Sequence, residues 1–257
     1  MRAAKVVFVN RYFAPDQSAT SRLVTDLASR LAERGIAVSV VTSRQRYEDP
    51  DAALPARESL GGVQVYRVDA ATRGRARLGG RALDYATFHA AASLTLLRHV
   101  SRGDVVVAKT DPPLISVTAS YAARLKHAAL INWLQDMFPE VAEALTPDLL
   151  PHPLARGLTA ARDRSLQRAA INIVLSEGMR ERLIAHGVAR RASRSYRTGP
   201  TQPASRRARQ PIPSLATGLR SPSVSSWDTR ATSAGPMNSI LCSGRRNCCA
   251  ASRALPF

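Results

Sequence analysis

Residues 132–140 read Asn-Trp-Leu-Gln-Asp-Met-Phe-Pro-Glu, and this stretch decides the expected fold. The apolar residues 128–131 come directly before it and are typical of a short buried strand. Pro139 cannot continue a central strand, but it suits the first turn of a helix. Asp136 is therefore expected where a strand passes into a helix. In open α/β sheets, ligands bind in the crevice beyond the carboxyl ends of the strands.

The residues on either side alternate between buried strands and amphipathic helices. Strands are expected at 5–10, 36–42, 63–68, 104–108 and 171–175. Helices are expected at about 21–34, 83–100, 114–125, 138–145, 154–169 and 176–186. Strand–helix–strand units cross over with a right hand. The sequence therefore predicts an α/β domain over residues 1–190, with a Rossmann-like parallel sheet and helices on both faces.

Three helices carry more specific expectations. Leu23, Leu27 and Leu31 recur at four-residue spacing and predict a face that packs on the core. The helix 83–100 follows the Arg- and Gly-rich residues 73–81, so it either packs on the core or docks with that loop on anionic lipid. In the helix 154–169, the arginines, Arg162 among them, are expected to point outward.

Charge and cysteine are concentrated in residues 191–257. The chain has 257 residues and a formal net charge of +18, and this last stretch holds 11 arginines, a single acidic residue and all three cysteines. It has no helical or strand period, so its composition predicts a disordered tail. Residues 1–190 have no cysteine, which excludes a disulfide framework or a cysteine metal site there.

The chain shows no signal-peptide pattern and no run of ~18 apolar residues that could span a membrane. We therefore expect a cytoplasmic protein whose only membrane contact is peripheral, at the inner face of the membrane.

Polar side chains follow three of the expected strands, in the loops 11–20, 109–111 and 135–136. The first of these loops, residues 11–20, lacks the G-x-G-x-x-G pattern of dinucleotide binders, which argues against an NAD enzyme. It still presents small polar groups at a helix N-terminus, where anions are favoured. The alternative is that these groups only cap helices. The cap candidates are Ser18, Thr20 or Ser21 for the first helix, Thr110 or Asp111 for the third, Asp136 for the fourth and Ser176 for the last.

Three stretches carry a family resemblance: Tyr-Phe-Ala-Pro at 12–15, Gln-Asp-Met-Phe-Pro-Glu at 135–140 and Ser-Glu-Gly-Met-Arg-Glu-Arg-Leu at 176–183. With the order of elements, they make residues 1–190 resemble the N-terminal domain of family-4 retaining glycosyltransferases of the GT-B fold. The resemblance is to those of colanic-acid and O-antigen synthesis. It implies an enzyme of two Rossmann-like domains, the N-terminal one for the acceptor and the C-terminal one for the nucleotide-sugar.

The resemblance implies transfer of a sugar, with retention, from a nucleotide-sugar to a lipid-linked or glycan acceptor in cell-surface polysaccharide synthesis. Asp136 would be the catalytic residue and would orient the acceptor hydroxyl or the reacting sugar, since a carboxylate accepts hydrogen bonds. The residues expected to bind the acceptor are Asn10, Tyr12, Gln17, Ser18, Lys109, Asp111 and Glu140. No cofactor or metal is expected, because the nucleotide-sugar is a substrate.

Residues 191–257 are further expected to be translated out of frame. If each true codon joins the third base of one codon to the first two bases of the next, residues 227–241 decode as a glycine-rich strand and loop. Two steps are forced: Trp227–Asp228 gives Gly, and Met237–Asn238 gives Glu. The decoded text resembles the start of a donor-binding domain. This predicts a frameshift between about residues 187 and 192, and a chain that lacks the donor site, is inactive alone and aggregates.

Two other classes of protein remain as alternatives. The Arg-rich tail could make the chain a basic membrane- or nucleic-acid-binding module. The tail is poor in the aromatic groups on which single-stranded nucleic acids stack, so no specific nucleic-acid partner is expected. A nucleotide-sugar epimerase is disfavoured by the missing glycine pattern.

Overall fold

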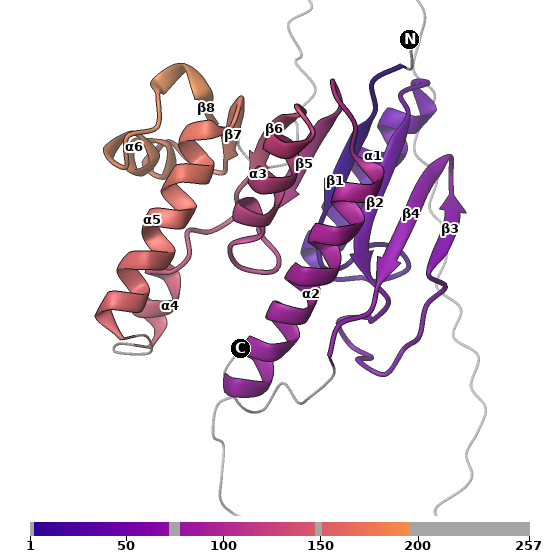
Figure 1. Cartoon of the computed structure of the whole chain (residues 1–257), viewed down its shortest axis with the longest axis horizontal. Helices are drawn as coiled ribbons and strands as arrows, with labels where there is room; N and C mark the ends of the chain where they lie inside the picture. The colour runs from indigo at the N-terminus through magenta and orange to yellow at the C-terminus, as the bar shows by residue number, and fades with distance from the viewer. Residues whose placement is uncertain (1–2, 72–77, 147–150, 196–257) are drawn as a thin grey trace, which may run out of the picture. The chain divides into compact units, whose positions relative to one another are not determined.

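A computed structural model of the chain describes residues 3–71, 78–146 and 151–195, which belong to one compact unit. Its centre is one eight-stranded sheet in the order β3-β4-β2-β1-β5-β6-β7-β8 (Figure 1). Only β3 runs antiparallel to its neighbour; every other pairing is parallel. The strands are β1 (Val6–Val9), β2 (Val38–Ser43), β3 (Arg57–Leu60), β4 (Val63–Val68), β5 (Val105–Lys109), β6 (Ala129–Trp133), β7 (Ile171–Val174) and β8 (Ser193–Ser195).

Helices cover both faces of this sheet because the chain first passes from β1 to β2 on one side of β1 and later returns to form β5 on the other side of β1. Right-handed crossovers then put α1 on one face and the later helices on the opposite face. Figure 1 shows α2, α3 and α5 on the side of the sheet that faces the viewer. The helices are α1 (Ala19–Glu33), α2 (Leu78–His99), α3 (Ile115–Leu125), α4 (Glu140–Leu145), α5 (His152–Arg168), α6 (Glu177–Ala185) and the short 3-10 helix η1 (Arg190–Ala192).

The predicted fold class is confirmed: the described residues form a Rossmann-like, mostly parallel α/β sheet with helices on both faces. The core of the described residues has a large cluster on each side of the sheet and a smaller third cluster that includes Leu166 of α5 and Leu183 of α6. Phe8 and Val40 pack with α1, and Val7 and Val41 pack with α2 and α3. Residues 196–257, most of the predicted tail, lie outside the described residues.

Three short elements were not predicted: β3, η1 and β8. Residues 57–60 read Arg-Glu-Ser-Leu and have no apolar run or alternation that would indicate a strand. The strand forms because Gly61 and Gly62, with φ of 54° and 82°, make a tight turn that folds it back onto β4.

The apolar face of α1 is shifted from the predicted leucine stripe. Ser21, Val24 and Ala28 are buried, whereas Leu27 is 37% exposed. The core interpretation of the helix 83–100 is confirmed, because Phe88 and other apolar side chains of α2 are fully buried in the core cluster. Of the Arg- and Gly-rich residues 73–81, which the alternative interpretation would dock on lipid, residues 73–77 lie outside the described residues.

The cap predictions are corrected at three helices and confirmed at one. Leu114 and Pro139 occupy the N-cap positions of α3 and α4, so neither Thr110 and Asp111 nor Asp136 is a cap. Ser18 occupies the N-cap position of α1, but its side chain makes no capping bond. Ser176 caps α6 as predicted, accepting a hydrogen bond from the Met179 N–H at 3.2 Å.

None of the helices in the described part of the chain combines the length and hydrophobicity that a membrane span requires.

Candidate functional site

The three predicted polar segments lie together at the carboxyl ends of neighbouring strands of the sheet. β1, β5 and β6 are adjacent and parallel, with Val9 beside Ala108 and Lys109 beside Trp133. The strand order also reverses here, because β2 lies on one side of β1 and β5 on the other. Such a reversal is the point at which open α/β sheets bind their ligands. Asn10 directly follows β1, Lys109 is the last residue of β5, and Asp136 lies three residues after the end of β6.

Lys109 is the last residue of β5, and its side chain is only 1% exposed. Its ammonium nitrogen lies 3.9 Å from the centre of the Trp133 ring, close enough for a cation–π contact. Burial lowers the pKa of Lys109 to about 7, although the nearby negative charge of Asp136 opposes the shift. Lys109 is therefore a mixture of ammonium and neutral amine near neutral pH.

Asp136 lies in the loop after β6 and lines the same small cavity as Lys109. Its side chain remains exposed to solvent, yet the surrounding protein raises the pKa of its carboxyl by desolvation, and Lys109 opposes that rise. The cavity has room of about 20 Å³, which is enough for one water-sized group. The hydroxyl of Thr110 accepts a hydrogen bond from the Gln135 N–H at 2.8 Å and so ties this loop to the end of β5.

The first loop has a rigid part and an exposed part. Asn10 is fully buried, and its side-chain N–H donates to the Tyr12 carbonyl at 2.6 Å. The ring of Tyr12 packs edge-on against that of Tyr47, with 5.7 Å between centroids. Gln17 is exposed and accepts a hydrogen bond from Nε of Arg22 at 3.1 Å. The backbone N–H of Ser18 donates to the carboxylate of Asp16 at 2.8 Å.

Two residues that the sequence did not single out hold this loop in place. The carboxylate of Asp16 is buried and also accepts from the Tyr47 N–H at 2.5 Å. The guanidinium of Arg11 is buried 3.8 Å from the carboxylate of Asp84 on α2 and lies over the rings of Tyr12 and Tyr85. The only signal for Arg11 in the sequence is a basic residue directly after a buried strand. Asp111, whose carbonyl accepts from the Arg11 N–H at 2.8 Å, lies beside it.

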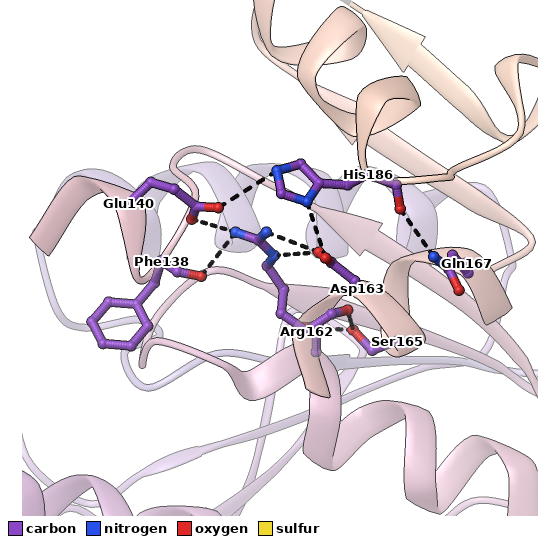
Figure 2. Close-up of polar contacts among 8 residues, drawn as sticks. Phe138, Glu140, Arg162, Asp163, Ser165, Gln167 and His186 are labelled. Carbon is purple, nitrogen blue, oxygen red and sulfur yellow. Dashed lines mark hydrogen bonds and ion pairs between the residues drawn. The ribbon is translucent and has the colours of Figure 1, made fainter. Parts of the chain in front are cut away.

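Glu140 is part of an ion-pair network rather than free at the edge of the sheet (Figure 2). Arg162 of α5 pairs with Glu140 and with Asp163, and it donates to the Phe138 carbonyl at 3.1 Å. His186 adds a contact of 3.0 Å to Asp163 and one of 3.7 Å to Glu140. This network therefore joins the loop that carries Asp136 to α5 and to the end of α6.

The prediction that Arg162 points outward is wrong, since its side chain is 4% exposed. Burial alone opposes its charge, but the hydrogen bonds and charges of Glu140 and Asp163 raise the pKa of Arg162. An amphipathic pattern places arginines on the solvent side, and nothing in residues 154–169 indicates that a distant glutamate pairs with one of them.

The structure thus places Asp136 and Lys109 on one cavity, Asn10 beside Lys109, and Tyr12 and Asp111 around the same strand ends. Gln17 and Ser18 lie further along the first loop, and Glu140 lies in the network with Arg162. Within the ranges 3–71, 78–146 and 151–195, no three histidine, cysteine or acidic side chains gather as metal ligands would.

Comparison with known proteins gives a family and a fold. Residues 18–194 match the family described as "Glycosyl transferase 4-like domain". A sucrose-phosphate synthase from Thermosynechococcus elongatus is similar in structure, with a TM-score of 0.52 and 12% identity over 76% of this chain and 48% of that one. This likeness supports the fold as the N-terminal half of a GT-B fold. No curated protein matches the chain.

Two further solved structures are less similar. Anabaena Alr3699/HepE in complex with UDP has a TM-score of 0.44 and 15% identity over 76% of this chain and 44% of that one. An alpha,alpha-trehalose 6-phosphate synthase from Burkholderia multivorans has a TM-score of 0.46 and 16% identity over 72% and 42%. The chain therefore spans less than half the length of each of these three solved structures.

Proposed function

The chain belongs to the glycosyl transferase 4-like domain family, and from that premise we propose that it contributes the acceptor side of a retaining glycosyltransferase. The proposed reaction transfers a sugar from a nucleotide-sugar to a lipid-linked or glycan acceptor in cell-surface polysaccharide synthesis. The proposed place is the cytoplasm, in peripheral contact with the inner face of the membrane.

The observation that carries this proposal is that Asp136 and Lys109 line one cavity at the point where the strand order of the sheet reverses. A carboxylate there can accept a hydrogen bond from an acceptor hydroxyl and fix its direction of attack. The raised pKa of the Asp136 carboxyl also makes it a better proton acceptor than an ordinary surface carboxylate.

In the proposed reaction, the residues of this chain bind and orient the acceptor. Asp136 positions the reacting hydroxyl, and the side chains of Asn10, Tyr12, Gln17, Ser18, Lys109, Asp111 and Glu140 form or support the acceptor site. The nucleotide-sugar is a substrate, and we propose that its site belongs to sequence other than residues 1–190. No cofactor is proposed.

We also propose that residues after about 190 are translated out of frame, on the strength of the forced glycine and glutamate described above. Sequencing of the coding DNA across codons 185–195 tests this directly. A continuous second Rossmann-like domain in the alternate frame is the expected result. If no coherent reading frame exists there, the tail is genuine and the frameshift proposal is wrong.

The activity test uses the gene with its reading frame restored. Membranes that contain this protein should transfer a labelled sugar from one member of a nucleotide-sugar panel to lipid-extractable or polymeric glycan. Asp136→Asn should lower the rate by about 100-fold or more, because the amide cannot take up a proton from the acceptor. Asp26→Asn, on the exposed side of α1, is the matched control and should leave the rate unchanged.

Two results would contradict the proposal. One is transfer with inversion at the anomeric carbon, which would remove the retaining mechanism. The other is full activity of the Asp136→Asn enzyme, which would remove Asp136 from the site.

The Arg-rich tail supports a second candidate function, nonspecific binding of nucleic acid or anionic membrane. Residues 191–257 carry 11 arginines and one acidic residue. Binding of the 257-residue chain to DNA should weaken steeply with salt and disappear when residues 196–257 are removed. DNA binding that survives this deletion would contradict a function of the tail, because the nucleic-acid site would then lie in the folded domain.

A further inference from the structure

The outer surface of α2 and α3 exposes several large apolar side chains. On α3, Tyr121 is 67% exposed and Leu125 is 58% exposed, and on α2 Leu94 is 48% exposed. Tyr121 and Leu125 are four residues apart, so they lie on one face of α3. Scattered apolar residues on a surface are ordinary, but a cluster of them marks an interaction site.

A groove between the two helices joins these side chains into one patch. The groove has a volume of about 250 Å³, and its lining includes Leu97 of α2 with Val117, Tyr121 and Leu125 of α3. Leu97 comes three residues after Leu94, so the two leucines lie on the same side of α2. Both helices lie on the face of the sheet that Figure 1 turns toward the viewer. We call Leu94, Leu97, Tyr121 and Leu125 the apolar patch.

Arginines lie at one end of the apolar patch. Arg98 and Arg124 come one turn after Leu94 and Tyr121 on the same two helices, and Arg102 follows the end of α2. Since the strands around these helices are parallel, α2 and α3 both end at the amino ends of the strands. All three arginines are exposed, and none of them forms an ion pair with another described residue.

Arg124 also lines a second groove, which lies on the other side of α3. This groove has a volume of about 400 Å³, and Arg168 of α5 lines it together with small and apolar side chains such as Ala123 and Leu130. Arg168 is exposed and likewise has no ion-pair partner among the described residues. Guanidinium groups bind phosphate oxygens through parallel hydrogen bonds, so two unpaired arginines on one groove are suited to a phosphate group.

The segment that builds the apolar patch is poor in acidic side chains. Residues 85–130 include only two, Asp104 and Asp111. Asp104 is 0% exposed, and its carboxylate accepts a hydrogen bond from the Ser101 N–H at 2.9 Å. Asp111 follows β5 at the carboxyl ends of the strands, whereas the arginines lie at the amino ends. The exposed charge that this segment places beside the patch is therefore positive.

His99, the last residue of α2, lies in the same positive field. Its ring stacks on the Tyr66 ring with 3.9 Å between centroids. Burial lowers the pKa of His99, and the positive charges of Lys5, Arg57 and Arg98 lower it further. This end of the domain therefore has the charge that complements an anionic surface.

We propose that the apolar patch and its arginines dock this domain on an anionic phospholipid bilayer. The leucines and Tyr121 enter the boundary between headgroups and acyl chains, and Arg98, Arg124 and Arg168 bind lipid phosphates. A bilayer offers alkyl chains and phosphates side by side, whereas a nucleic acid offers phosphates without alkyl chains. This inference rests on the peripheral membrane contact of the proposed function and names the surface that makes it.

The test measures whether a side chain of the apolar patch enters the bilayer. Tyr121→Trp is made in the 257-residue chain, and its fluorescence is compared with that of the unmodified chain, which contains Trp133 and Trp227. The vesicles contain phosphatidylcholine and phosphatidylglycerol with brominated acyl chains, which quench only a tryptophan that reaches them. The additional fluorescence of Tyr121→Trp should be quenched by these vesicles and should stay unchanged with vesicles of phosphatidylcholine alone.

Asp26→Trp is the matched control, because Asp26 is exposed on α1, which packs on the opposite face of the sheet. The Arg-rich residues 191–257 are the same in both variants and can bring either protein to a vesicle. Only the Tyr121→Trp fluorescence should nevertheless be quenched, since only the apolar patch enters the bilayer.

A second pair of variants tests the arginines. Arg98→Ala combined with Arg124→Ala, in the Tyr121→Trp chain, should raise the lipid concentration at half-maximal quenching by about tenfold or more. Arg30→Ala combined with Arg34→Ala removes the same charge near the end of α1 and should change that concentration by about twofold at most. All four arginines are exposed, and circular dichroism checks that the variants fold.

Two results would overturn the proposal, and they can be told apart. If the chain co-sediments with anionic vesicles while Tyr121→Trp and Asp26→Trp are quenched equally or not at all, the docking surface is wrong, and another part of the chain makes the membrane contact. If the chain does not bind anionic vesicles, the membrane contact of the proposed function fails together with this surface. Sugar transfer is measured separately, so neither result decides whether the family assignment extends to that reaction.

Discussion

At the scale of single residues, Lys109 gives the most direct link between burial and pH. Its folded-state pKa of about 7 lies below the ordinary lysine value of ~10.4. The unfolded chain therefore binds more protons than the folded chain between those two values, and stability rises with pH across that window. The penalty of burying the ammonium is fully present below about pH 7 and is relieved toward pH 10.

This predicts that the free energy of unfolding increases by a few kcal/mol between about pH 7 and pH 10, relative to Lys109→Met. The methionine variant removes the buried charge and should be the more stable protein at pH 6. Urea unfolding of both proteins at a series of pH values measures the difference. If their stabilities run parallel from pH 6 to pH 10, the lysine is not desolvated as the structure shows.

The same residues show what a sequence can and cannot indicate. Lys109 and Asp136 were predicted because each follows a buried strand, and strand order then fixes where they lie. Whether they bind an acceptor stays a prediction. Arg11 and Arg162 were not predicted to be buried, because each is charged and its burial depends on carboxylates from distant segments, Asp84 and Glu140.

At the scale of elements, the network around Arg162 fixes the loop between β6 and α4. Arg162→Ala would leave Glu140 and Asp163 without their main cation and the Phe138 carbonyl without a donor. We expect a loss of about 2 kcal/mol in unfolding free energy, because the buried Arg162 donates hydrogen bonds to two carboxylates that stay partly exposed after its removal. Thermal and urea unfolding measure this loss.

Arg180→Ala is the matched control for this prediction. Arg180 forms a pair with Glu177 on α6, where Glu177 is half-exposed, and such surface pairs contribute ~0–1 kcal/mol. Hydrogen exchange gives a second check, because only Arg162→Ala should speed exchange at the Val141 and Glu143 amides. Equal losses in the two variants would show that the Arg162 network has no special role.

Elements were predictable where one periodicity dominates. The strands β1, β2, β5, β6 and β7 are mainly apolar and β4 alternates between apolar and polar residues, and the sequence located all six. β3 and β8 were missed because their residues are polar, and their formation depends on a glycine turn and on an already formed neighbour. The domain boundary at residue 190 stays a prediction.

At the scale of the whole described unit, the order of crossovers leaves one sheet face partly uncovered. The chain moves in one direction through β5, β6, β7 and β8, so right-handed connections place the helices between them on the side of α2. Among the described helices, α1 packs on the other face. Beside it lies an apolar groove of about 540 Å³, which is lined by Val6, Phe8, Leu27, Leu31, Val105, Val107, Ile131, Trp133, Ile171, Ile173 and Arg194.

Parallel sheets are normally covered on both faces, so this groove should make the purified chain bind hydrophobic dyes and self-associate. Replacing Ile131 and Ile173 together by threonine keeps β-branched side chains in the strands while adding a hydroxyl to each. We expect lower anilinonaphthalene sulfonate fluorescence and association at higher protein concentrations, measured by sedimentation velocity. Leu145→Ser, at a 74% exposed position on α4, is the control and should change neither. If the control lowers dye binding as much as the double variant, scattered surface residues rather than the groove drive association.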